Sequence, residues 1–434
     1  MKSPHFLLFA LAAALLLTLP VSALGSGTTL RVGPNRTYTA PCAAIAVASA
    51  GDTVLIDPAL YLNDTCAWST DNLTLVGLLD RFGRRPHIDD SGLTDTATTG
   101  HLAEYKGIWV PSGNNTVVEN IEFSGATLSN DDGANGAGIR IEGVNMTILN
   151  CYFHHNQDGI LESNIAGSNI VIKYSEFYLN GVGNPLLDEG YGETHNLYIG
   201  RCASLEFAFN YSHDANVGHL LKSRAAVNYI LYNRLTGENG TDSYEIDLPN
   251  GGTSYVIGNL VEKGPNSGNH TMLRYGEEGL TNPEQDLYVV NNSFVHPTIF
   301  GGYFVSDASS TTGALLENNI FYGTATITDQ SVATLVTNST ADPLFVSLDN
   351  YNYHLTSGSP DIGAGTQPGT ANGYSLTPRY EYVQPACGQV RPAVSHISIG
   401  AYEFGYGGPI LHCHPPDEFC PACESSPLPL ADSQ

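Results

Sequence analysis

The sequence predicts an all-β fold and, within that class, a right-handed parallel β-helix. The first observation is composition: the 434 residues include 46 Gly and 24 Pro but only 3 Met and 2 Trp, which favours turns and short strands over long helices. The second is a repeat in which an Asn is followed by apolar or aromatic residues. The third is a set of runs in which every other residue is apolar, as a half-buried strand requires.

The repeats return at the spacing of one β-helical coil. Phe123 and Phe153 are 30 residues apart, and Phe153 and Phe177 are 24 apart, so each interval has room for two or three short strands. A propeller blade would need about 40 residues, and a sandwich would show no repeat. An Asn at the bend tolerates the left-handed backbone region and can bond along the stack. We therefore expect successive coils over residues 108–325.

Three segments divide the chain. Residues 1–23 combine a charged start, an apolar run and small residues, which is the pattern of a secretory signal peptide. Residues 24–404 are expected to form the β-helix, with an N-terminal cap in 28–60 and a closing segment in 341–404 to cover the ends of the stack. Residues 405–434 form a Cys- and Pro-rich tail. The protein is therefore predicted to be extracellular or at a cell surface.

The eight cysteines of an exported chain are interpreted first as disulfides. Cys42 and Cys66 are the best local pair. The tail carries a second group of soft ligands, namely His412, Cys413, His414, Cys420 and Cys423. These residues can close disulfides or ligate zinc, because thiolates and imidazoles at short spacing suit a tetrahedral ion. Both interpretations of the tail stay open.

The charge of the chain excludes one class of partner. Only 17 Lys and Arg oppose 43 Asp and Glu, which gives a net charge of −26. Such an acidic chain would repel a phosphate backbone, so nucleic acid is excluded. No segment after the signal peptide is long and apolar enough to span a membrane, and we expect a monomer.

Phrases at both ends of the chain resemble known proteins. Leu30-Arg31-Val32-Gly33 lies near the start, and Ile399-Gly400-Ala401-Tyr402-Glu403 lies near the end. With the repeats over roughly residues 28–350, they are similar to the pectate-lyase-like superfamily of secreted right-handed β-helix proteins. The resemblance implies the fold and the location.

A row of outward residues is predicted where basic residues concentrate, since six of the 17 lie within 201–274. Four residues are expected to point inward in successive coils, namely Leu197, Leu221, Ile246 and Leu273. The residue after each should point outward, because side chains alternate along a strand. The predicted outward row is Tyr198, Lys222, Asp247 and Arg274. Flanking positions add Arg224, Glu245, His219, His213 and Arg201.

Cations grouped in so acidic a chain favour a groove for an acidic polysaccharide. Cleavage of a uronate chain by β-elimination requires a base, a group that neutralises the uronate carboxylate, and a proton for the leaving oxygen. Lys222 is the predicted base, Arg224 or Arg274 the neutralising group, and Tyr198 or an Arg the acid. Their hard oxygens make Glu245 and Asp247 the predicted ligands of a Ca²⁺ ion that could also neutralise the substrate.

One stretch also resembles polysaccharide lyases of the alginate lyase and chondroitinase B type. His219-Leu220-Leu221-Lys222-Ser223 is similar to the coil that carries the Lys base in those enzymes. Leu273-Arg274-Tyr275-Gly276 is similar to their Arg phrase, although it comes one coil later. The resemblance implies a Lys base and a Ca²⁺ ion. His219 is predicted to belong to the catalytic group, and Arg201, His213 and Tyr275 to bind substrate.

Other functions stay open. The outward row can be a set of surface ion pairs, or it can bind glycan without cleaving it in an adhesive protein. A glycoside hydrolase needs two carboxylates, for which Glu245 with Asp247, or Asp188 with Glu189, are the candidates. His154 and His155 are interpreted as a bend pair rather than as metal ligands.

Overall fold

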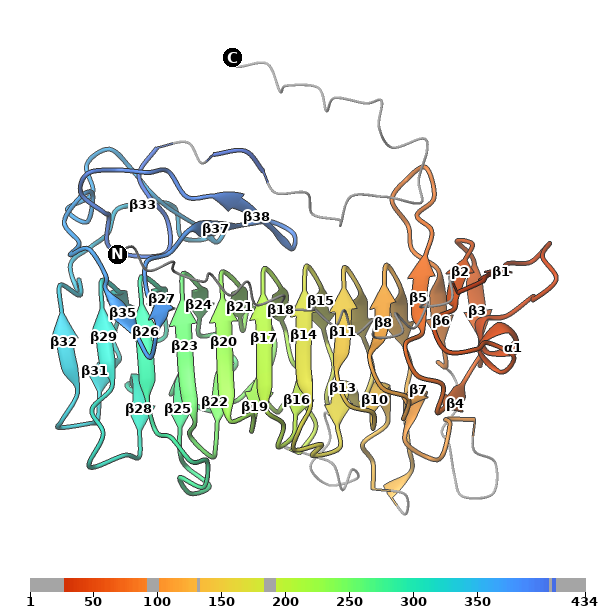
Figure 1. Cartoon of the computed structure of the whole chain (residues 1–434). Coiled ribbons are helices and arrows are strands. Elements are labelled where there is room, and N and C mark those ends of the chain that lie inside the picture. Colours follow the sequence, from red (N-terminus) through yellow and green to blue (C-terminus); the bar gives the residue numbers. More distant parts are fainter. Residues whose placement is uncertain (1–26, 92–100, 131–132, 183–192, 406–407, 411–434) are drawn as a thin grey trace, which may run out of the picture.

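The computed structural model describes residues 27–91, 101–130, 133–182, 193–405 and 408–410. The chain winds into a parallel β-helix in which successive coils each add one strand to three stacked sheets (Figure 1). We name the sheets A, B and C, with 12, 10 and 10 strands. The predicted signal peptide, the Asp188 and Glu189 pair, and the tail from His412 to Cys423 lie outside the described residues.

From β2 onward, each sheet takes every third strand of the solenoid, and β1 adds one more strand to sheet A. Sheet A contains β1 (Thr29–Val32), β2 (Thr53–Ile56), β5 (Thr74–Gly77), β8 (Thr116–Glu119), β11 (Met146–Leu149), β14 (Asn169–Lys173), β17 (Ser204–Ala208), β20 (Val227–Leu231), β23 (Thr253–Ile257), β26 (Leu287–Val290), β29 (Leu315–Glu317) and β32 (Thr334–Val336). Sheet B contains β3 (Leu60–Leu62), β6 (His87–Asp89), β9 (Glu122–Ser124), β12 (Tyr152–His154), β15 (Glu176–Tyr178), β18 (Tyr211–His213), β21 (Arg234–Thr236), β24 (Leu260–Glu262), β27 (Ser293–His296) and β30 (Ile320–Gly323). Sheet C contains β4 (Cys66–Trp68), β7 (Gly107–Pro111), β10 (Ala137–Ile141), β13 (Asp158–Glu162), β16 (Leu197–Ile199), β19 (Lys222–Ser223), β22 (Ile246–Leu248), β25 (Leu273–Tyr275), β28 (Tyr303–Asp307) and β31 (Thr326–Thr328).

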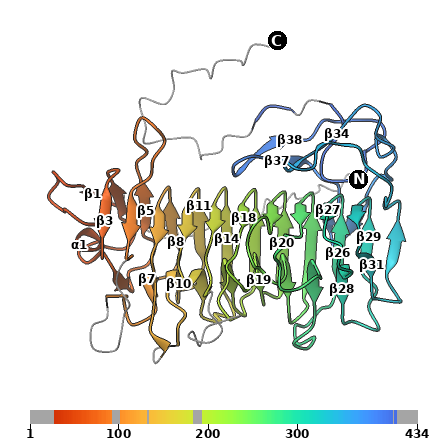
Figure 2. The same ribbon diagram turned by 180° about the vertical axis from the view of Figure 1, so that it is seen from behind.

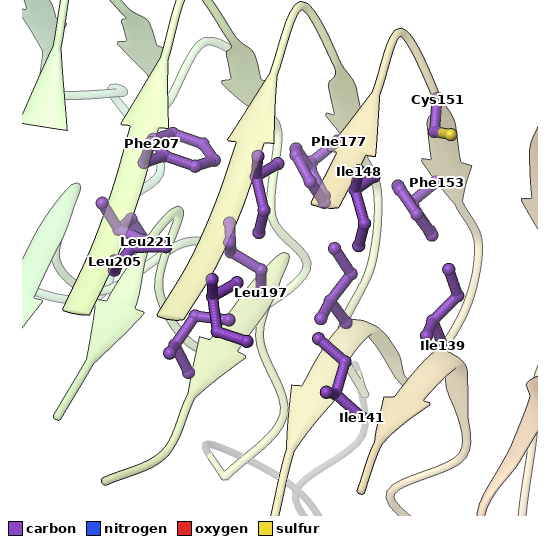
Figure 3. Close-up of a cluster of buried hydrophobic side chains, with 14 of the residues drawn as sticks. Ile139, Ile141, Ile148, Cys151, Phe153, Phe177, Leu197, Leu205, Phe207 and Leu221 are labelled. Atoms are coloured by element: carbon purple, nitrogen blue, oxygen red, sulfur yellow. The ribbon is translucent and has the colours of Figure 1, made fainter. Parts of the chain in front are cut away.

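The core runs along the inside of the stack, where apolar side chains of all three sheets meet (Figure 3). The four residues predicted to point inward in sheet C, Leu197, Leu221, Ile246 and Leu273, are all 0% exposed. Burial of each such side chain is worth about 1.5–3 kcal/mol, and a coil obtains it only when its neighbours are in place. Phe123, Phe153 and Phe177 stack face to face inside sheet B at 5.2 and 5.1 Å between ring centroids. The prediction of coils is confirmed, and so is their inward phase in sheet C.

The sequence predicts that one Asn at each bend both adopts the left-handed region and bonds along the stack. In the structure two adjacent positions divide these roles. Asn120 and Asn291 adopt the left-handed region, with φ of 59° and 51°. The buried ladder runs one residue later, where the side-chain oxygen of Asn259 accepts the backbone N–H of Asn233 at 2.9 Å. Members of this ladder are Asn210, Asn233, Asn259, Asn292, Asn319 and Asn338. The ladder satisfies polar backbone at a corner where no sheet can do so.

The N-terminal end carries the one helix among the described residues, α1 (Pro41–Ile45), which is shorter than the predicted amphipathic run. The amphipathic run that we expected as the cap extends over residues 40–50, so the helix covers only part of it. The helix contacts β1 and β2, and Ala44 and Ile45 join the core. The predicted Cys42–Cys66 disulfide is confirmed. No described helix is long and apolar enough to cross a membrane.

The C-terminal segment folds into three small antiparallel hairpins. They are β33 (Phe345–Ser347) with β34 (Asn352–Leu355), β35 (Thr370–Ala371) with β36 (Tyr374–Ser375), and β37 (Tyr380–Val383) with β38 (Cys387–Val390). We expected this segment to close the last coil. Its apolar contacts lie along the outer side of sheets A and B, where Tyr374 packs near Tyr255 and Tyr382 near Tyr211 (Figures 1 and 2). Sheet C lies outside these contacts.

Candidate functional site

The outer face of sheet C carries the predicted row. Lys222 pairs in register with Tyr198 on one side and with Asp247 on the other, and Asp247 pairs with Arg274. Neighbouring coils are about 4.8 Å apart, so these side chains form a continuous line. The prediction that Lys222 and Arg274 share one sheet is confirmed.

Lys222 lies between two carboxylates. Its Nζ is 3.3 Å from Oδ2 of Asp247 and donates a hydrogen bond of 3.0 Å to Oε1 of Glu278. Asp247 is 2% exposed, and burial raises its pKa to about 6 against the attraction of Lys222. The side chain of Glu278 is 45% exposed and comes from the loop after β25. The pair with Asp247 is therefore fixed, whereas Glu278 can move away into solvent.

Arg224 completes a receptor for a carboxylate. Its Nη2 donates to Oε2 of Glu278 at 2.5 Å, while Lys222 holds the other oxygen of the same carboxylate. Arg224 is held in place by its remaining donors, which bond the hydroxyl of Tyr198 at 2.5 Å and the side-chain oxygen of Asn250 at 2.7 Å. One carboxylate thus spans both cations in the geometry that a bound organic acid would take.

His219 supports Asp247 from behind. Its Nδ1 accepts the backbone N–H of Tyr244 at 3.1 Å, so the ring proton of the neutral imidazole is on Nε2, 3.4 Å from Oδ2 of Asp247. Burial, aided by the charge of Lys222, holds the pKa of His219 well below its usual value. His195 stacks on His219 with 4.7 Å between ring centroids. His219 thus places the N–H of its ring beside the carboxylate of Asp247.

A cavity of about 530 Å³ lies over this part of sheet C. Tyr198, Lys222, Arg224 and Glu278 line it together with residues from earlier coils, including Arg140, Asp158, Glu162 and His195. Asp158 is 1% exposed and one of its oxygens has no hydrogen-bond partner among the described residues, so burial raises its pKa well above the usual range. The lining of the cavity therefore combines three cations, Arg140, Lys222 and Arg224, with four carboxyl groups, Asp158, Glu162, Glu193 and Glu278.

Several predicted residues lie elsewhere. Arg274 is two positions along the row from Lys222 and forms ion pairs with Glu277 at 3.2 Å and Asp329 at 3.7 Å. Arg201 is exposed at the turn after β16. His213 belongs to sheet B and contacts Glu176 and Asp214, so it is on another face of the stack.

The predicted positions of Tyr275 and Glu245 are wrong. Tyr275 was expected to bind substrate, but it points inward, is fully buried, and donates its hydroxyl to the backbone oxygen of Gly252. Glu245 was expected beside Asp247. It is also fully buried, because β22 begins only at Ile246 and the preceding residue follows the corner instead of the strand.

The predicted Ca²⁺ pair does not fit the structure. Glu245 forms a buried ion pair of 2.7 Å with Lys263, and Asp247 contacts Lys222, so their oxygens face different partners. The same placement removes them as an opposed pair for glycoside hydrolysis. Two clusters among the described residues bring three metal-binding groups together, namely His87, Glu122 and His154, and His213, Asp214 and Glu238. Neither cluster is on sheet C.

Sequence reasoning missed Glu278 and His195. Glu278 lies in a loop, so no alternation or spacing indicates it. The sequence does contain an indication of His195. It lies two residues before the inward Leu197, just as His219 lies two residues before the inward Leu221. Stacking of the two rings follows from that equal spacing.

Comparisons with known proteins agree with the fold. No family model and no curated protein matches the chain. The crystal structure of pectate lyase Pel9A matches with a TM-score of 0.54 at 14% identity, covering 88% of this chain and 98% of that one. A pectin methylesterase from Aspergillus niger matches with a TM-score of 0.32 at 12% identity over 79% of this chain and 94% of its own. The alginate lyase AlyGC of family PL6 matches with a TM-score of 0.29 at 11% identity, covering 76% of this chain and 57% of that one.

Only the first likeness is close enough to use, and at that identity it concerns the fold alone. It defines the class of this molecule, which is a parallel β-helix resembling the pectate lyase fold.

Proposed function

We propose that the protein is an extracellular enzyme that binds an acidic, uronate-containing polysaccharide on sheet C and cleaves it by β-elimination. One observation carries the proposal: Lys222 and Arg224 together hold a carboxylate, that of Glu278, at the edge of an open cavity. A uronate carboxylate that displaces Glu278 would meet the same donors. The disulfide supports an oxidising location, since such bonds persist outside the cytosol.

The chemistry can be assigned to five side chains. Arg224 neutralises the uronate carboxylate, which makes the proton on the neighbouring carbon easier to remove. Lys222 removes that proton after passing one of its own to Asp247, whose neutral form is favoured by burial. The bond from the sugar to the leaving oxygen breaks, a carbon–carbon double bond forms, and Tyr198 gives its proton to the leaving oxygen. His219 orients Asp247 throughout.

Incubation with a panel of uronic-acid polymers tests the proposal. We expect at least one polymer to yield chain ends with the ultraviolet absorbance of the new double bond, and a neutral glucan to yield none. New reducing ends without that absorbance would indicate hydrolysis. Binding without either product would indicate the alternative, a non-catalytic glycan-binding or adhesive protein.

A further inference from the structure

Sheet B carries three side chains that converge on one point of its outer face, away from the cavity on sheet C. His87 on β6, Glu122 on β9 and His154 on β12 come from three successive coils. Each offers one ligand atom, and these atoms all lie within 4.8 Å of one another. All three side chains point outward, because the middle residue of each strand, such as Ile88 or Phe123, is buried in the core.

The hydrogen bonds around His87 fix which of its nitrogens carries the proton. Ser124 donates its hydroxyl proton to Asp89 at 2.9 Å, since an ionised carboxylate can only accept. Nε2 of His87 lies 2.7 Å from the oxygen of Ser124 and must therefore be the donor to it. In the neutral imidazole, Nδ1 then has a free lone pair, and it faces Oε1 of Glu122 at 3.6 Å. A cation placed between this lone pair and the carboxylate oxygen would satisfy both acceptors.

The third group, His154, contacts the same carboxylate. Nε2 of His154 is 3.0 Å from the same oxygen of Glu122, and its Nδ1 is 2.8 Å from Nδ1 of His155. His155 adopts a left-handed φ of 56°, so the bend expected of this pair is present and places the second ring behind the first. Metal-binding histidines donate their other ring N–H to a neighbouring group, and here Ser124 and His155 are placed to accept such hydrogen bonds.

The distances match a small transition metal. Bonds of about 2.0–2.2 Å to zinc in tetrahedral geometry place ligand atoms about 3.4 Å apart, and the observed 3.0 and 3.6 Å bracket that value. Two imidazoles and one carboxylate are a ligand set for zinc or a similar ion, whereas Ca²⁺ and Mg²⁺ prefer oxygen alone.

We propose that His87, Glu122 and His154 bind a divalent transition metal ion such as Zn²⁺ on the outer face of sheet B. His87 and Glu122 also line a cavity of about 530 Å³. A fourth coordination position is therefore open to water or a small anion, and Arg85 on the cavity wall favours the anion, whereas Arg84 is paired with Asp80. The site does not depend on the function assigned to sheet C.

The other cluster is a weaker candidate. His213, Asp214 and Glu238 lie close together, but Arg234 forms an ion pair of 2.6 Å with Glu238 and so already supplies the positive charge. His213 also has a carboxylate on each ring nitrogen, Asp214 at 2.7 Å and Glu176 at 3.2 Å. Both carboxylates can accept protons from the ring, so no lone pair is left for a metal.

Calorimetric titration of the metal-free full chain with Zn²⁺ tests the site. The titration is made in a Cys413→Ser, Cys420→Ser, Cys423→Ser background, so that tail thiolates cannot supply the signal. We expect one ion to bind, His154→Asn to weaken binding by more than about 100-fold, and Ca²⁺ not to compete. Ser124→Ala keeps all three ligands and should weaken binding by about 10- to 100-fold through the lost support of His87.

His213→Asn is the matched control, because it removes a histidine of the other cluster from the same sheet. Its affinity for Zn²⁺ should equal that of the parent chain. Circular dichroism of each variant checks that the fold is kept, and Ser124→Ala gives the result if His154→Asn does not fold. Absence of binding by the parent chain, full affinity in the folded Ser124→Ala and His154→Asn variants, or a loss in His213→Asn instead would overturn the proposal.

Discussion

Glu278 holds the position that we assign to the carboxylate of the substrate, so Glu278→Gln should tighten binding of an acidic sugar. The substitution removes the charge that binds Lys222 at 3.0 Å and Arg224 at 2.5 Å, while it keeps the size of the side chain. A partly exposed ion pair is worth up to about 1 kcal/mol. Release of two such pairs before binding therefore costs about 1–2 kcal/mol. The variant does not pay this cost, so its Kd should be about 5- to 30-fold lower.

The assay is a calorimetric titration with a free uronic acid, which has no glycosidic bond to cleave. Glu277→Gln is the matched control, because Glu277 is the preceding residue, is equally exposed at 45%, and pairs with Arg274 instead. The control should leave Kd unchanged at a given salt concentration. Unchanged or weaker binding by Glu278→Gln would refute the idea that Glu278 stands where the substrate binds.

Three further predictions concern stability. Leu221→Ala should lower the free energy of unfolding by about 2–5 kcal/mol in a denaturant titration, while Leu335→Ala, at a position 51% exposed, should change it by less than about 0.5 kcal/mol. Asn259→Ala should cost at least about 2 kcal/mol, because it leaves the buried N–H of Asn233 without its acceptor, and a melting curve indistinguishable from that of the parent would contradict this role. Folding raises the pKa of Asp247 from 3.8 to about 6, so the native state binds the proton more tightly and loses stability as pH rises from about 4 to 6. In Asp247→Asn the free energy of unfolding should fall less over this pH range. If it falls equally steeply in the variant and the parent, the pKa of Asp247 is not raised by folding.

Alternation along the strands was sufficient to predict the outward row. The inward phase of Leu197 and Leu221 sets the direction of every neighbouring side chain in sheet C, and the parallel register aligns Tyr198 with Lys222. These features depend on local backbone geometry, which a short stretch of sequence contains. The same rule places Tyr275 inside, since it stands two residues after an inward leucine.

Residues at corners and in loops could not be placed from the sequence. Glu245 is one residue outside its strand, where alternation no longer applies. His213 is only six residues from His219, but a corner between them turns the chain from sheet B to sheet C. Glu278 meets Lys222 over a separation of 56 residues through a loop with no repeat. Such contacts depend on the path of the whole coil and leave no periodic signal.

The central claim is that Lys222 removes the proton, and one rate measurement tests it most directly. The polymer cleaved by the parent protein is given to Lys222→Arg, and the ultraviolet absorbance of unsaturated ends is followed at saturating polymer. The guanidinium keeps the charge that holds the carboxylate but stays protonated and cannot act as a base. Lys173→Met, which removes a lysine paired with Glu206 on sheet A, serves as the control and should keep the parental rate. We expect Lys222→Arg to bind the polymer and to form no unsaturated ends, whereas unsaturated ends formed at the parental rate would contradict the assignment of Lys222 as the base.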